Sequence, residues 1–264
     1  MYVVVWEGDR VSARDSVAVE KPPSGTSLRD AFVESLQALT LGLVQLRNDS
    51  IALGPFALLR FGPPAVTGQG VTWPIEGGLL AARPGGQWRI EATGGRVEVV
   101  ATGYAPRLPR PIYDLTHLQV HLLFTRLFLL RLRGREPLPG EPAPSSDRAA
   151  AATIDAALCV TLAGFLGRRR LKSFLAVAAI YHIGCWSVSG RTLGGAVMNE
   201  RVVSFDGTRL TPQQAALRLA LLPLSWIAWR PLHDRIAACT VIKDEEKAKG
   251  RLHAAPLPQT KGLG

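Results

Sequence analysis

An aspartate and a histidine inside two apolar stretches are the side chains best suited to chemistry in this sequence. Asp155 is the single charged residue of the 19-residue stretch 149–167. His182 lies in the middle of a second stretch, 173–190, which has no charged residue. Ionisable groups in such surroundings are typical of cation or proton sites, because charge away from water must be paired, neutralised or placed in a water-filled space.

If both stretches are helices joined near Arg170, His182 and Asp155 lie 12 and 15 residues from that turn. At about 1.5 Å per residue, their depths agree within about 5 Å. Facing each other, they would form a carboxylate–imidazole pair that titrates near neutral pH. The alternatives are an arginine partner for Asp155, and a backbone carbonyl or a hydroxyl for His182. Arg148, seven residues before Asp155, lies on nearly the same helix face at the edge of the apolar stretch, where a phosphate headgroup is the expected contact.

Five polar residues after the second stretch are expected to gather at its far end. One interpretation is a pocket for an anion or a lipid headgroup, and the other is an Arg–Asp network that holds the chain segments together. The residues are Arg191, Arg201, Arg218, His233 and Asp234.

His117 and His121 have a spacing that can share a metal ion on one helix face. No third ligand is evident, and Leu118-Gln119-Val120 supplies no catalytic glutamate. The sequence also contains no G-x-S-x-G, P-loop, GxGxxG, HExxH or zinc pattern. We therefore expect no metal, no other cofactor and no enzymatic activity.

The elements that position Asp155 and His182 are predicted to be membrane helices. Nineteen helical residues span about 28 Å, close to a hydrocarbon core of about 30 Å. Arg168, Arg169 and Arg170 would form the tip of the hairpin. The stretch 215–229 is apolar but shorter, and as a helix it predicts a tilted span, a re-entrant piece or an interfacial helix. The expected fold is thus an α-helical membrane domain of two to three spans over residues 148–243.

Residues 1–135 predict a soluble α+β domain, an antiparallel sheet with helices. Its first helix is expected to open with a capping box at Ser27 and Asp30. The order of elements is compatible with a curved sheet that grips a long helix. A proline-rich linker, 136–147, follows this domain, and a disordered tail is expected at 244–264. Strands are predicted at 2–6, 11–19, 50–61, 70–82, 87–93 and 96–103, and helices at 27–47 and 111–133.

The composition favours a chain that is partly in water and partly in lipid. The apolar fraction is 47%, and the mean hydropathy is +0.13. The 31 Lys and Arg against 21 Asp and Glu give a net charge of +10. No RNA-binding signature or zinc pattern accompanies this charge, so we expect arginines beside anionic headgroups of a lipid bilayer and no nucleic acid partner.

Several short motifs of the C-terminal half occur in the order and spacing of the RDD family, which this part of the chain resembles over residues 148–243. Gly195 departs from the family pattern, which usually has a lysine there. The resemblance implies a multi-pass membrane protein, and a transport role, including cation/proton exchange, has been suggested for some members. The motifs are Arg148 with Ile154-Asp155, Gly190-Arg-Thr-Leu-Gly194, Arg201-Val-Val-Ser-Phe-Asp-Gly207, Arg218, and Leu232-His-Asp234 with Thr240-Val-Ile242.

Two functions remain open for such a chain. One is an accessory, assembly or docking subunit, and the alternative is an ion-coupled (cation/proton) transport component that uses Asp155 and His182. Two or three spans are too few to enclose a pathway, so we expect a homo-oligomer or a larger membrane complex.

The composition is typical of a bacterial genome rich in GC, which predicts the bacterial cytoplasmic (inner) membrane. An N-terminus without a basic signal region, the arginines of 126–135 and the resemblance predict that both termini are cytoplasmic. Arg168 to Arg170 alone predict the opposite orientation.

Overall fold

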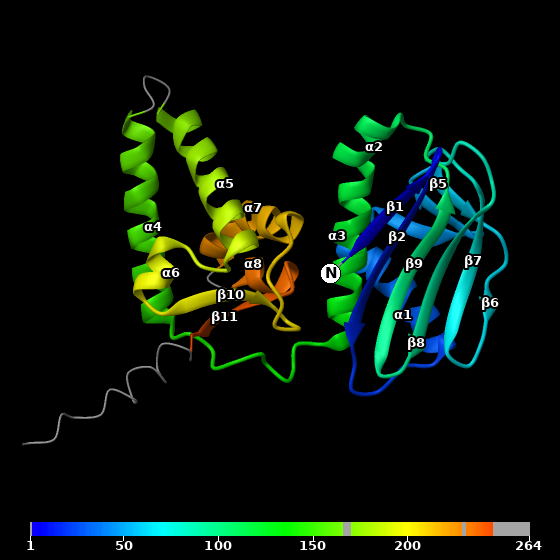
Figure 1. Ribbon diagram of the computed structural model, residues 1–264, viewed down its shortest axis with the longest axis horizontal. Coiled ribbons are helices and arrows are strands. Elements are labelled where there is room, and N and C mark those ends of the chain that lie inside the picture. The colour runs from blue at the N-terminus through cyan, green and yellow to red at the C-terminus, as the bar shows by residue number, and fades with distance from the viewer. Residues whose placement is uncertain (1, 166–169, 229–230, 245–264) are drawn as a thin grey trace, which may run out of the picture. The chain divides into compact units, whose positions relative to one another are not determined.

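The computed structural model describes residues 2–165, 170–228 and 231–244 (Figure 1). These residues form two compact units. The first unit contains residues 2–137 and the segment 231–238, which includes helix α8 (Leu232–Ile236). The second unit contains the other described residues, from Leu138 onward. The change from one unit to the other after Pro137 falls within the predicted linker 136–147.

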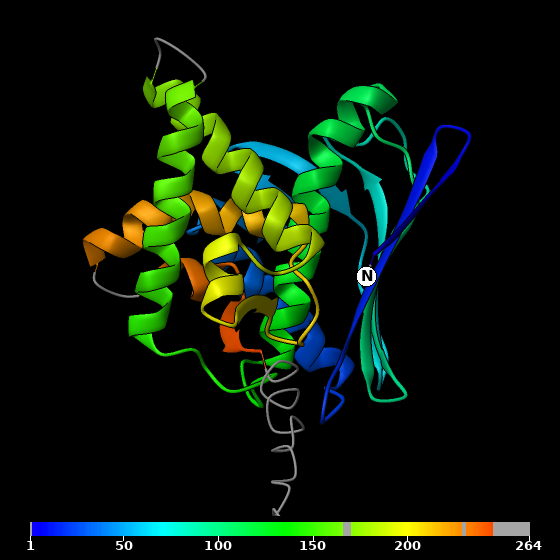
Figure 2. The same cartoon turned by 60° about the vertical axis from the view of Figure 1, so that its left-hand side comes forward.

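The first unit is an antiparallel sheet with helices, as predicted. Among the described residues the sheet has nine strands in the order β1-β2-β9-β8-β7-β5-β4-β3, with β6 paired to β7. Helices α1, α2 and α3 accompany the sheet, and α1 and α3 pack on it (Figures 1 and 2). The strands are β1 (Val3–Glu7), β2 (Arg10–Ala18), β3 (Val44–Arg47), β4 (Ser50–Leu53), β5 (Phe56–Phe61), β6 (Ala65–Val66), β7 (Gly70–Gly77), β8 (Gly86–Thr93) and β9 (Arg96–Tyr104), and the helices are α1 (Gly25–Leu39), α2 (Arg110–Leu115) and α3 (His117–Arg133).

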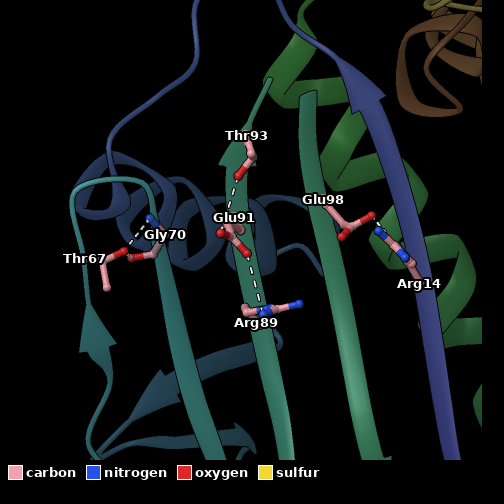
Figure 3. A network of polar contacts seen from close by, with 7 residues as sticks. All are labelled: Arg14, Thr67, Gly70, Arg89, Glu91, Thr93 and Glu98. Atoms are coloured by element: carbon pink, nitrogen blue, oxygen red, sulfur yellow. Dashed lines mark hydrogen bonds and ion pairs between the residues drawn. The ribbon is translucent and has the colours of Figure 1, made fainter. Parts of the chain in front are cut away.

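Alternation of side chains gives the sheet one face toward the helices and one toward water. Along β8 and β9, buried residues mostly alternate with exposed or half-exposed ones. On the buried face, the Phe32 ring of α1 lies 5.2 Å from the Trp73 ring and 5.8 Å from the Trp88 ring. The other face carries ion pairs, Arg14 with Glu98 and Arg89 with Glu91 (Figure 3). Exposed pairs of this kind contribute at most about 1 kcal/mol, so the core holds this unit together.

The helix predicted from Ser27 to Arg47 is displaced at both ends. Its N-cap is Ser24, whose hydroxyl accepts a hydrogen bond from the Ser27 N–H at 3.2 Å. The helix ends at Leu39, because Leu41 and Gly42 adopt positive φ angles of 54° and 77° and reverse the chain into β3. The predicted strand 50–61 is likewise a hairpin of β4 and β5, and the predicted helix 111–133 is interrupted at Thr116 between α2 and α3.

The second unit contains the predicted membrane hairpin. Helices α4 (Ser145–Phe165) and α5 (Arg170–Val188) lie side by side in both views (Figures 1 and 2). Within the described residues, these two helices are long and apolar enough, by length and composition, to cross a membrane. Helix α7 (Pro212–Ala228), the predicted third stretch, is not one of them. Arg168 and Arg169, predicted at the hairpin tip, lie outside the described residues.

Short elements complete this unit and were not predicted. Helix α6 (Leu193–Val197) follows α5, and strands β10 (Glu200–Ser204) and β11 (Cys239–Lys243) pair antiparallel. Residues 141–143 lie along β11, with bonds from the Ala143 N–H to the Val241 carbonyl at 3.0 Å and from the Lys243 N–H to the Glu141 carbonyl at 2.9 Å.

Two predicted boundaries of the second unit differ from those in the structure. Helix α4 begins at Ser145, inside the predicted linker, and Asp244, predicted to open the tail, is buried. The rest of that tail, 245–264, lies outside the described residues.

Candidate functional site

The Asp155 carboxylate joins three elements of the second unit. Asp155 is at the midpoint of α4 and its side chain is buried. Its Oδ1 accepts hydrogen bonds from the Tyr181 hydroxyl of α5 at 2.7 Å and from the Gly194 N–H of α6 at 2.8 Å. The Tyr181 oxygen in turn accepts a bond from the Leu193 N–H at 2.7 Å. One carboxylate oxygen therefore ties α4 both to α5 and to the turn that follows it.

The Gly-Arg-Thr-Leu-Gly segment supplies this contact because its backbone approaches α4 closely. Thr192 caps α6, and its hydroxyl accepts a bond from the Gly195 N–H at 3.1 Å. A Cβ atom on Gly194 would lie 2.1 Å from the Ala151 carbonyl oxygen of α4. Only glycine lets the backbone N–H of this position reach Asp155 without displacing a helix.

His182 is not the hydrogen-bond partner of Asp155, so the predicted pair is corrected to Asp155 with Tyr181. The His182 ring centroid lies 5.0 Å from that of Tyr181 and 4.8 Å from that of Trp186. Its Nδ1 atom is buried and makes no hydrogen bond within the described residues. The guanidinium of Arg218, which is buried, lies 4.2 Å from the Trp186 ring centroid. This cation–π contact with an indole is one of the interactions of Arg218 in α7.

Of the five residues predicted to gather after α5, the structure shows two lining one cavity. Arg191 and Arg201 line one cavity of about 490 Å³, together with Arg209. Arg218 contacts the Trp186 ring. His233 and Asp234 are both buried in α8, with the His233 Nε2 atom 3.3 Å from the Asp234 Oδ1 atom.

The cavity that Arg191, Arg201 and Arg209 line lies at the end of α5. Arg191 pairs with Asp244, and Arg209 donates to the Val188 carbonyl at 2.8 Å. The Nε atom of Arg201 is buried and has no hydrogen-bond partner within the described chain. Arginine presents several donors in a planar fork that matches phosphate. The structure thus brings Arg191 and Arg201 together, and it adds Arg209, which the sequence did not single out.

The sequence analysis also did not single out Glu200, a buried glutamate near Arg148. Arg148 is half-buried in the first turn of α4. Glu200 of β10 is buried, and burial raises its pKa above the ordinary value of 4.5, against the lowering influence of the Lys243 charge. Lys243 contacts Asp147 and donates to the Met198 carbonyl at 3.0 Å. The burial of Glu200 follows from the pairing of β10 with β11, which no local pattern in the sequence indicates.

His117 and His121 belong to a cavity in the first unit. This cavity has a volume of about 200 Å³, and its wall includes both histidines and Trp88. Burial lowers the pKa of both imidazoles, that of His121 to about 4. Among the described residues, no group of three or more histidine, cysteine or acidic side chains is placed to hold a metal ion.

Comparison with known proteins finds one relationship. No curated protein and no solved structure matches the chain, and no family model matches the N-terminal region. A model of the RDD family matches residues 170–242, from the beginning of α5 into β11. The matched range contains Tyr181, His182 and the Gly194 turn, while Arg148 and Asp155 precede it. Together with the two apolar helices, this match indicates a membrane protein. Residues 170–242 in the C-terminal half thus match the RDD family, whereas the predicted resemblance began at Arg148.

Proposed function

We propose that this protein is an accessory or docking subunit, held in the membrane by α4 and α5, that has no catalytic centre of its own. The observation that favours docking over ion transport is the use of Asp155 as a structural tie between α4, α5 and α6. Placing a carboxylate at the centre of a membrane helix costs about 2.5–3.5 kcal/mol. Two hydrogen bonds to a charged acceptor, each contributing about 1.5–3 kcal/mol, are enough to offset that cost. These two hydrogen bonds therefore explain the position of Asp155 without a transported ion.

Anionic headgroups of the bilayer are the partner that we propose for the arginine cavity. Arg191 is neutralised by Asp244, whereas the buried Nε of Arg201 lacks a hydrogen-bond partner in the part of the chain that the structure describes. A headgroup phosphate would supply that acceptor. Nucleic acid is not needed to explain the basic charge.

The experiment that tests the docking role compares Asp155→Asn with Asp155→Leu. The asparagine carbonyl oxygen can accept both bonds that Asp155 Oδ1 accepts, whereas leucine can accept neither. We expect the wild type and Asp155→Asn to co-purify with a larger membrane complex in mild detergent, and Asp155→Leu to lose folded yield. Loss of the complex in Asp155→Asn, at wild-type folded yield, would refute the structural role of this carboxylate. Recovery of the wild type alone would refute the docking function.

Ion-coupled transport is the second candidate, and one feature favours it. The buried, unbonded Nδ1 of His182 belongs to a ring that lies beside Tyr181, which itself holds Asp155. The His182 ring and the Tyr181 hydroxyl could together pass a proton between water and the Asp155 carboxylate. It predicts that Asp155→Asn and His182→Ala abolish cation/proton flux in proteoliposomes. Wild-type flux in both variants would exclude this function.

For location, we propose the bacterial cytoplasmic membrane with both termini in the cytoplasm. Cysteine-accessibility labelling of Arg169→Cys in intact cells tests this orientation. Labelling in intact cells is expected, and labelling only after permeabilisation would show the reverse orientation.

A further inference from the structure

We infer that the cavity of the first unit is a binding site for a neutral, apolar small molecule that carries one oxygen able to hydrogen-bond. The site is independent of the docking role proposed above, because it lies entirely within residues of the first unit.

The size of the cavity sets it apart from ordinary packing. Protein interiors contain few voids larger than a water molecule. A dry apolar cavity of about 150 Å³ admits benzene, so the cavity of about 200 Å³ admits a somewhat larger molecule, such as a fused pair of aromatic rings. Its wall comes from the inner face of the sheet and from α1, α2 and α3. Val120 of α3 belongs to the wall and is 67% exposed, so the wall reaches the surface of this unit beside α3.

The wall is mostly apolar, and Tyr113 and His117 form a polar corner in it. The rings of Tyr113 and His117 lie 5.2 Å apart, and both residues line the cavity. Tyr113 is 1% exposed, yet its hydroxyl makes no hydrogen bond to any described residue. The buried Nδ1 of His117 also has no partner there. Buried polar groups are normally hydrogen-bonded, and leaving one unsatisfied costs about 1–3 kcal/mol. A ligand oxygen at this corner would satisfy them.

The charge of the wall selects a neutral ligand. The lining contains no lysine, arginine, aspartate or glutamate. Burial lowers the pKa of His117 and of His121, so both imidazoles are uncharged at neutral pH. Burial raises the pKa of the Tyr113 hydroxyl, which therefore stays protonated. A carboxylate or an ammonium group in this cavity would have no counter-charge, and burying an unpaired ion is strongly unfavourable.

The test uses three ligands on one scaffold: 2-naphthol, naphthalene and 2-naphthoate. The full chain is placed in lipid nanodiscs, binding is followed by fluorescence titration, and the signal from empty nanodiscs is subtracted. We expect saturable binding of 2-naphthol, weaker binding of naphthalene and no binding of 2-naphthoate. Equal binding of all three ligands, tighter binding of the carboxylate, or no binding beyond empty nanodiscs would overturn the inference.

Two matched variants test whether the oxygen of the ligand binds at Tyr113. Tyr113→Phe keeps the ring and removes the unbonded hydroxyl, and we expect about five- to tenfold weaker binding of 2-naphthol with unchanged binding of naphthalene. Tyr2→Phe is the control, because it also removes a tyrosine hydroxyl and Tyr2 does not line the cavity. It should leave the affinity for 2-naphthol within about twofold. Unchanged affinity for 2-naphthol in Tyr113→Phe, with naphthalene binding retained, would refute the polar corner.

Discussion

Replacing Gly194 with alanine tests the contact between α4 and α6 most directly. The added Cβ would lie 2.1 Å from the Ala151 carbonyl oxygen and 2.8 Å from its carbonyl carbon. Ordinary contacts of this kind begin at 3.4 Å, so the two backbones must separate by about 1 Å. Such a shift also lengthens the bond from the Gly194 N–H to Asp155. Overpacking costs about 1–3 kcal/mol, and a hydrogen bond to a charged group contributes about 1.5–3 kcal/mol. We therefore expect Gly194→Ala to lower the free energy of unfolding by about 3 kcal/mol or more.

The assay is reversible unfolding of the full chain in mixed micelles, followed by far-ultraviolet circular dichroism as the fraction of denaturing detergent rises. Gly184→Ala in α5 is the matched control, because nothing lies within 4 Å of its added Cβ. A helix interior gains up to about 1 kcal/mol from this change, so the control should be at least as stable as the wild type. If Gly194→Ala unfolds at the same detergent fraction as Gly184→Ala, the close approach of α6 to α4 is wrong.

Three further changes test other parts of the two units. Tyr181→Phe removes the hydroxyl that links Leu193 to Asp155, so it should cost about 1.5–3 kcal/mol in the same assay, and an unchanged midpoint would count against this link. Because burial raises the pKa of Glu200, its contribution to stability is complete below pH 4.5 and is lost as the pH rises through the raised pKa. Glu200→Gln should remove that decline from the profile of unfolding midpoint against pH, whereas parallel profiles would show that Glu200 titrates normally. For His121 the pKa is lowered from 6.5 to about 4, so its contribution is present above pH 6.5 and is lost as the pH falls through about 4. His121→Phe should flatten the acid side of the profile for the first unit, and an unaltered acid slope would contradict the burial of this imidazole.

The sequence predicted elements whose periodicity is interrupted by clear turns. Strands β2, β8 and β9 appear within one or two residues of their expected limits, because their apolar alternation stops at glycine or proline. The helix α1 shows where the same reasoning fails. Leu43 and Leu46 continue the helical spacing of Leu36 and Leu39, but the chain reverses at Gly42 and the two later leucines fall in or beside β3. Apolar spacing alone does not reveal such a reversal.

At the candidate site, the positions of Asp155 and His182 along their helices could be predicted from the sequence. The directions in which their side chains point could not. The count from the hairpin turn placed Asp155 and His182 at similar depth, yet neighbouring residues on a helix point about 100° apart, and it is Tyr181 that faces the carboxylate. A signal was available in the sequence, because the hydroxyl of a tyrosine in an apolar helix requires a partner. For Asp244 and Glu200 no comparable signal exists, since their burial depends on the pairing of β10 with β11.

The position of β11 has a consequence for the order in which the protein is made. This strand holds both β10 and residues 141–143, so it joins the start of α4 to the chain that follows α5. About 55 residues separate the end of α5 at Val188 from the end of β11 at Lys243. At about 5–20 residues per second, the hairpin of α4 and α5 leaves the ribosome several seconds before the strand that fastens it. Until β11 has been made, Glu200 has no partner strand beside it and the start of α4 is not yet fastened to the chain that follows α5.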